Sequence, residues 1–174
     1  TALAFAGLTI PASGSCTVTV VVTSDTPGTH NNQASGVSSA QAVTGAVSNI
    51  AALTVISAAP TIAKAFAPST INADGTSTIT FTLANTNGIA LTSAGFTDAL
   101  TNMAISAAGA AGGTCAGAAG NVYAAGQTAL TLSNLTVPAN GSCTVTVVVT
   151  SDRPGTHNNT TSGVASAQAP IGAV

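Results

Sequence analysis

The sequence has very little charge. Its 174 residues include two basic side chains and four acidic ones, all of them aspartate, with no glutamate. Nucleic-acid binding depends on clusters of Lys and Arg, which two cations cannot provide, so we exclude a nucleic-acid partner. Because spread charge normally keeps soluble proteins apart, a surface this uncharged suits a protein that is assembled or tethered outside the cell.

Long apolar runs and tryptophan are also missing. Aromatic residues make up 3% of the chain, and no uninterrupted apolar run is long enough to cross a bilayer, so we predict no membrane span. A mean hydropathy of +0.51 does not fit intrinsic disorder. No positively charged segment opens the chain as in a signal peptide, and we interpret it as a mature or excised piece.

Motifs for catalysis and for ligand binding are absent as well. The sequence has no Ser–His–Asp order, no paired carboxylates, no HExxH and no phosphate-binding loop. His30 and His157 recur in the same Pro-Gly-Thr-His-Asn-Asn segment, and we interpret them as packing residues. We therefore expect no enzyme, no cofactor and no metal site.

An internal repeat dominates the organisation of the chain. Residues 1–47 match residues 128–174 at an offset of 127 with 35 identities, so that Cys16 corresponds to Cys143. We predict that 1–57 is the C-terminal part of one repeat, that 58–60 is a linker, and that 61–174 is the next repeat without its last strand. The chain is then either a segment of a long tandem array, which we favour, or a subunit completed by strand donation from a neighbour.

The periodicity predicts an all-β protein. Alternating residues in Cys16–Thr23 and Ser77–Leu83 are typical of half-buried strands, and Asn-Gly and Pro-Gly pairs mark turns between strands. Several short strands in each repeat favour an immunoglobulin-like β-sandwich, in tandem copies. The Gly/Ala-rich stretch 104–120 is expected to be a long surface loop.

The three cysteines indicate one disulfide. Cys115 and Cys143 both lie in the second repeat, whereas the partner of Cys16 would precede residue 1. A Cys115–Cys143 bridge would place the protein outside the cytoplasm. Three free thiols, or a metal site, are the alternatives, although no His or second Cys stands at ligand spacing.

Three polar side chains fall on apolar strand faces. Alternation places Lys64 with Ile62 and Phe66, Asn85 with Leu83, and Asp98 with Phe96. An unpaired buried ammonium is unfavourable, so Asp98 is the natural partner of Lys64.

Two outcomes of this arrangement remain open. In the first, Lys64 attacks the amide of Asn85 with Asp98 carrying the proton, which forms an isopeptide bond in a single self-modifying event. In the second, Lys64 and Asp98 form a buried ion pair, while Asn85 bonds local backbone near the Asn85-Thr-Asn-Gly turn.

Several segments together resemble a conserved repeat domain of unknown function found in tandem in large bacterial cell-surface proteins. They are 60–71 (PTIAKAFAPSTI), 77–87 (STITFTLANTN), 95–100 (GFTDAL), the cysteine pair, PANGSCTVTV and PGTHNN. The resemblance implies an immunoglobulin-like fold, secretion and a role in a stalk or fibre. Related surface modules contain Lys–Asn isopeptide bonds with an acidic helper, roles that would fall on Lys64, Asn85 and Asp98. In the better-known cross-linked families the asparagine comes after the acidic residue in the sequence, whereas here Asn85 comes before Asp98.

We therefore expect a structural repeat module of a bacterial surface fibre, sheath or adhesin stalk, located on the extracellular side. Its partners would be neighbouring repeats or identical chains. The alternative is an adhesin domain that binds glycan or ice through exposed Thr and Asn, such as the alternate threonines of 76–82.

Overall fold

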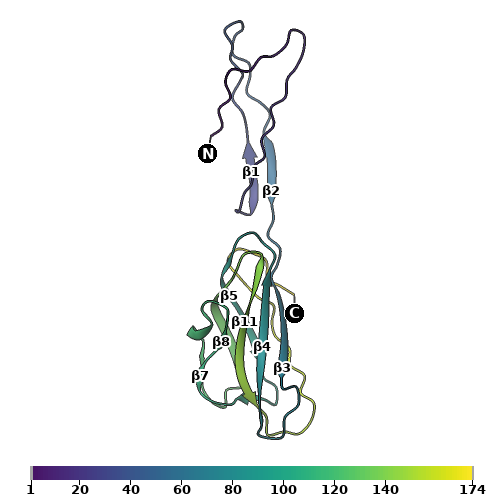
Figure 1. Cartoon of the computed structure of the whole chain (residues 1–174), viewed down its shortest axis with the longest axis vertical. Helices are drawn as coiled ribbons and strands as arrows, with labels where there is room; N and C mark the ends of the chain where they lie inside the picture. The colour runs from purple at the N-terminus through teal and green to yellow at the C-terminus, as the bar shows by residue number, and fades with distance from the viewer. Residues whose placement is uncertain (1, 174) are drawn as a thin grey trace.

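The computed structural model describes residues 2–173, and nearly all of its regular structure is β-strand (Figure 1). The strands are β1 (Gly28–Asn32), β2 (Ala51–Val55), β3 (Thr61–Ala67), β4 (Thr76–Asn85), β5 (Leu91–Ala99), β6 (Ala104–Ile105), β7 (Gly109–Ala110), β8 (Gly112–Gly113), β9 (Val122–Tyr123), β10 (Ala129–Val137) and β11 (Gly141–Thr150). One turn of 3-10 helix, η1, spans Ala118–Gly120.

Residues 2–57 form only one pair of strands. β1 and β2 are antiparallel, with His30 opposite Leu53. The strand predicted over Cys16–Thr23 is not formed, which corrects the expectation from the sequence. The identical segment Cys143–Thr150 lies in β11 and is hydrogen-bonded to β4 along its whole length. Alternation thus marks a segment able to form a strand, but the strand needs a neighbour to pair with.

Residues 60–173 form two layers of sheet. One sheet has the order β3-β4-β11-β6, with β8 also paired to β11, and the other contains β10 and β5. The segment after β11 runs along the free edge of β5, where Thr161 bridges to Asp98 and Ala165 to Gly95. A small separate pair joins β7 and β9.

The core lies between these layers and follows the predicted alternation. Along β4, Ile79, Phe81, Leu83 and Asn85 are all buried, while the threonines between them are more accessible. The rings of Phe81 on β4 and Phe96 on β5 meet with centroids 4.9 Å apart, which ties one sheet to the other. Buried aromatic contacts of this kind add to the stabilisation from area alone.

The Gly/Ala-rich stretch 104–120 is not the simple surface loop expected from its composition. It contains β6, β7, β8 and η1, and it buries Ala111, Cys115 and Ala118. Gly113 explains part of the glycine content, because its φ of 112° and its close approach to the backbone of Thr144 leave no room for a side chain. The small residues allow this segment to lie directly on β11.

The two regions are joined end to end. In Figure 1, β2 leads through residues 56–60 into β3 with the chain continuing in nearly the same direction, and the molecule is elongated along this line. The C-terminal end of the chain returns to the linker, where Gly172 lies against the backbone of Pro60.

Candidate functional site

A buried polar cluster connects the two layers. Lys64 is the middle residue of the edge strand β3, and Asp98 is near the end of β5. Lys64 Nζ lies 2.9 Å from Asp98 Oδ2, with the two side chains 16% and 0% exposed. This is the ion pair expected from strand alternation. Because removing two charges from water is unfavourable, such a pair needs further hydrogen bonds to satisfy its remaining polar atoms.

Asn159 provides those hydrogen bonds. It lies in the segment that runs along β5, and its Nδ2 donates to Asp98 Oδ1 at 2.7 Å and to Ala99 O at 2.7 Å. Both amide hydrogens are therefore engaged, which turns Oδ1 toward Lys64, and Lys64 Nζ donates to that oxygen. Asn159 was not among the site residues predicted from the sequence. The unchanged recurrence of Gly-Thr-His-Asn-Asn in both copies is the sequence signal that could have identified it.

Asn85 does not lie in this cluster, which corrects the isopeptide set inferred from the sequence. Its Nδ2 donates to Ile89 O at 2.8 Å and Pro138 O at 3.0 Å. Lys64 pairs in register with Phe81, whereas Asn85 is at the far end of β4. Strand parity placed both side chains on the same face but gave no information about their distance along the strand.

Asn85 instead supports a clamp on the linker. Its Oδ1 accepts hydrogen bonds from both N and Nδ2 of Asn87, at 2.9 and 2.8 Å. Asn87 then holds both backbone groups of Ala58: its Oδ1 accepts from the amide at 2.7 Å, and its Nδ2 donates to the carbonyl at 2.8 Å. Since Asn85 is 2% exposed, a buried amide fixes the direction in which the linker enters the second region.

The predicted Cys115–Cys143 disulfide is present, with an S–S distance of 2.03 Å and a Cα–Cα distance of 4.8 Å. It joins the Gly/Ala-rich stretch to β11. Cys16, the counterpart of Cys143, is a free exposed cysteine.

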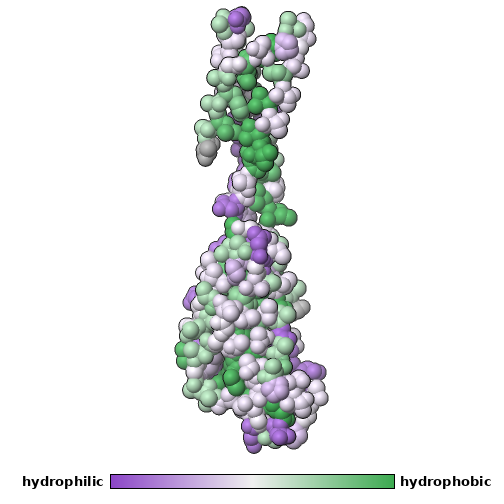
Figure 2. Space-filling view, viewed as in Figure 1, coloured by the Kyte–Doolittle hydropathy of each residue, from purple (hydrophilic) through white to green (hydrophobic). Residues whose placement is uncertain are grey.

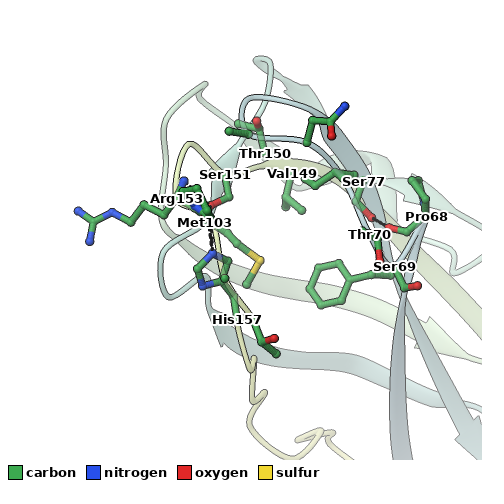
Figure 3. A pocket seen from close by; sticks show the side chains of 17 residues that line it. Pro68, Ser69, Thr70, Ser77, Met103, Val149, Thr150, Ser151, Arg153 and His157 are labelled. Atoms are coloured by element: carbon green, nitrogen blue, oxygen red, sulfur yellow. Dashed lines mark hydrogen bonds between the residues drawn. The ribbon is translucent and has the colours of Figure 1, made fainter.

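The histidines close local turns. His157 Nε2 lies 2.8 Å from Arg153 O and 3.4 Å from Ser151 Oγ. These residues border an open cavity of about 310 Å³ at the end away from the linker, and Arg153 projects outward from it (Figure 3). His30 makes the same contact to Thr26 O at 2.7 Å. A hydrogen-bonded turn that forms in both copies supports a structural use of the histidine.

The outer face of β4 and β11 presents threonines but is partly covered. Thr82 lies opposite Thr144, and Thr80 opposite Thr146. Thr144 Oγ1 lies 3.2 Å from Thr114 Oγ1, so the Gly/Ala-rich stretch occupies part of this face.

Burial raises the pKa of Tyr123 to about 12. Its hydroxyl donates to Thr131 O at 3.0 Å.

Among residues 2–173, no group of three His, Cys, Asp or Glu side chains is placed to hold a metal ion. Within the same residues, no helix is long and apolar enough to cross a membrane.

One comparison with known proteins identifies a family. A family model described as "Domain of unknown function (DUF7933)" matches residues 1–55 and 60–172. No curated protein matches the chain.

Proposed function

The chain belongs to the DUF7933 family, and we propose that it serves as a structural module in a bacterial surface fibre or stalk, outside the cell. In this proposal each module is an immunoglobulin-like sandwich, and successive modules are joined in tandem through short linkers. The module bears load and binds its neighbours rather than transforming a substrate.

The main support is a set of apolar positions that are exposed in the first copy and buried in the second. Residues 2–57 carry most of the hydrophobic surface visible in Figure 2. The exposed residues are Leu3, Phe5, Leu8, Ile10, Val18, Val20, Val22 and Val37, and their counterparts Leu130, Leu132, Leu135, Val137, Val145, Val147, Val149 and Val164 are each at most 7% exposed. Burial of one such side chain contributes about 1.5–3 kcal/mol, so an uncovered face of this size is strongly unfavourable.

The second copy shows what covers this face. There, β4 pairs with β11 and β5 pairs with β10, and residues of β4 and β5 such as Phe81 and Phe96 fill the core. We therefore infer that the first copy is covered by a stretch equivalent to 61–127, from the preceding module of the same polypeptide. Donation of the equivalent strands by another chain is the competing arrangement.

The linker supports an end-to-end arrangement. Five residues separate β2 from β3. Asn87 holds the backbone of Ala58 by accepting one hydrogen bond from its amide and donating another to its carbonyl. A linker this short, with its middle fixed to the following module, restricts bending between modules. The buried disulfide adds resistance to unfolding and favours an oxidising location.

The surface chemistry fits assembly. Lys64 and Asp98 neutralise each other inside the module, which leaves one basic and three acidic side chains for the whole surface. Mutual repulsion between neighbouring chains is therefore small, and lateral or end-to-end contacts should depend little on salt.

The proposal is tested by supplying the missing strands from the chain's own sequence. A second copy of residues 61–127 is fused ahead of residue 1, and hydrogen exchange is compared for segments 8–22 and 135–149. We expect exchange in 8–22 to slow by about two orders of magnitude or more, which corresponds to about 3 kcal/mol of local stability.

The matched control is the same fusion with the added copy of Phe81 replaced by Asp, which should leave 8–22 unprotected. If the unaltered fusion also leaves 8–22 exchanging freely, the first copy does not form a module of this kind. Protection of 8–22 in the unfused chain that appears only at high concentration would favour completion by another chain.

A further inference from the structure

The Lys64, Asp98 and Asn159 side chains are arranged for a covalent reaction. Lys64 Nζ contacts the amide oxygen of Asn159, so the amide carbon Cγ is one bond further away. Asp98 touches both reacting nitrogens, with Oδ2 2.9 Å from Lys64 Nζ and Oδ1 2.7 Å from Asn159 Nδ2. We propose that Lys64 and Asn159 join in an intramolecular isopeptide bond, with Asp98 as the catalytic acid and base.

The geometry assigns each atom a role. Asp98 Oδ2 accepts a proton from the Lys64 ammonium, and the neutral amine adds to Cγ of Asn159. Asp98 passes that proton to Nδ2, the Cγ–Nδ2 bond breaks, and ammonia departs. The second proton lost by the Lys64 nitrogen is also carried by Asp98 and converts the ammonia to an ammonium ion. In sum, one ammonium and one carboxamide give one secondary amide and one ammonium ion, and Asp98 ends as the carboxylate it began.

Burial and fixation favour this step. The Asp98 side chain is fully buried and that of Lys64 is 16% exposed, so few water molecules compete for the amide. The hydrogen bond from Asn159 Nδ2 to Ala99 O holds the amide in one orientation. Reacting groups held in contact gain a large effective concentration relative to the same groups free in solution.

The bond would connect the edge strand β3 to the segment that follows β11. Lys64 lies on β3, which pairs only with β4 among the described strands. Asn159 lies beyond β11, close to the free edge of β5. A covalent link between them fastens the start of the module to its end, and pulling on the two ends then loads the bond rather than the hydrogen bonds between strands. The inference does not rest on the proposed fibre role.

The first test is the intact mass of the full chain after complete reduction and denaturation. Reduction breaks the Cys115–Cys143 disulfide, whereas an isopeptide bond is not reduced, so any remaining cross-link is not a disulfide. We expect a mass lower than that of the sequence by one ammonia. A mass equal to that of the sequence overturns the proposal.

The scarcity of basic residues makes trypsin a second, independent test. Trypsin does not cleave before proline, so Arg153, which precedes Pro154, is not cut and Lys64 is the one cleavage site. An unlinked, reduced and unfolded chain therefore gives the two peptides 1–64 and 65–174. In the linked chain the side chain of Lys64 is an amide that trypsin does not recognise, so the chain remains uncut. Release of peptide 1–64 from the bulk of the material contradicts the bond.

Variants identify the amide that reacts. Asn159→Ala and Lys64→Arg should abolish the mass deficit, and Lys64→Arg keeps a cation beside Asp98 so that the fold is preserved. Asn159→Asp should replace the loss of ammonia by a loss of water, because the leaving group then changes from nitrogen to oxygen. The matched control Asn85→Ala should keep the full deficit. A deficit that persists in Asn159→Ala, or that disappears in Asn85→Ala, rules out the assignment to Asn159.

Discussion

Residues 2–46 and 129–173 are copies of one sequence in two environments. In the second copy Val145 is fully buried in β11, while its counterpart Val18 is 46% exposed and outside any strand. The side chains are identical, so the difference arises from what surrounds them. In the second copy β4, β6 and β8 pair with β11. In the first copy no strand of residues 2–57 pairs with Cys16–Thr23, the segment that corresponds to Cys143–Thr150 of β11.

Other features are the same in both copies. The His30 and His157 turns have nearly equal geometry, and Gly45 N donates to Val37 O at 2.9 Å as Gly172 N donates to Val164 O at 3.0 Å. These contacts link residues close in sequence, so their formation requires no distant partner. The comparison separates structure determined locally from structure that depends on long-range strand pairing.

The largest expected effect comes from placing a charge at the two equivalent valines. Val145→Asp buries an unpaired carboxylate in the core and should destabilise the second region by about 3–5 kcal/mol. Val18→Asp should change the free energy of unfolding of that second region by less than about 0.5 kcal/mol. Urea unfolding followed by fluorescence of Tyr123, the one tyrosine of the chain, measures both. Equal losses at the two positions would mean that Val18 is also packed in a core.

Reduction of the disulfide should have the next largest effect. Cys115 and Cys143 are separated by 28 positions, and loss of a loop of this size is expected to lower the free energy of unfolding by about 3–4 kcal/mol. Thermal unfolding with and without reductant measures it. Cys16→Ser serves as the control and should show the same response, since Cys16 is exposed and unpaired.

High pH should weaken only the region that contains Tyr123. Its folded pKa of about 12 lies above the ordinary value of 10.0, so the folded state holds the phenol proton more tightly than the unfolded state. Stability from this group is complete below pH 10 and decreases as the pH rises toward 12, by about 2 kcal/mol. Unfolding free energies across this range test it, and Tyr123→Phe should remove the dependence. A decrease that is unchanged in Tyr123→Phe would have another origin.

The smallest effect is expected at the linker. Asn87→Ala removes two hydrogen bonds to Ala58, each worth about 0.5–1.5 kcal/mol. We expect little change in the unfolding of the second region but a wider range of angles between the regions, measured by small-angle X-ray scattering. The exposed neighbour Thr86 provides the control, Thr86→Ala. An unchanged scattering profile for Asn87→Ala would show that the clamp does not set the angle.

Strand alternation predicted which faces are buried, and the Lys64–Asp98 pair followed from it. Alternation failed where the outcome depended on a neighbour. It predicted a strand at Cys16–Thr23 that lacks a partner, and it placed Asn85 on the face of Lys64 without fixing the distance between them. Composition failed for residues 104–120, because small residues that are typical of loops also permit close packing against a sheet.

The amino-acid sequence was sufficient to specify the β class, the alternation of buried and exposed residues in the core strands of residues 60–173, the turns at His30 and His157, and the pairing of Cys115 with Cys143. These depend on residue type and on neighbours nearby in the chain, or on the count of cysteines in one repeat. The contact of Asn159 with Lys64 and the support that Asn85 gives to the linker clamp could be seen only in the folded molecule. Both depend on which distant segments lie side by side and in which register, and that is set by the packing of the whole module.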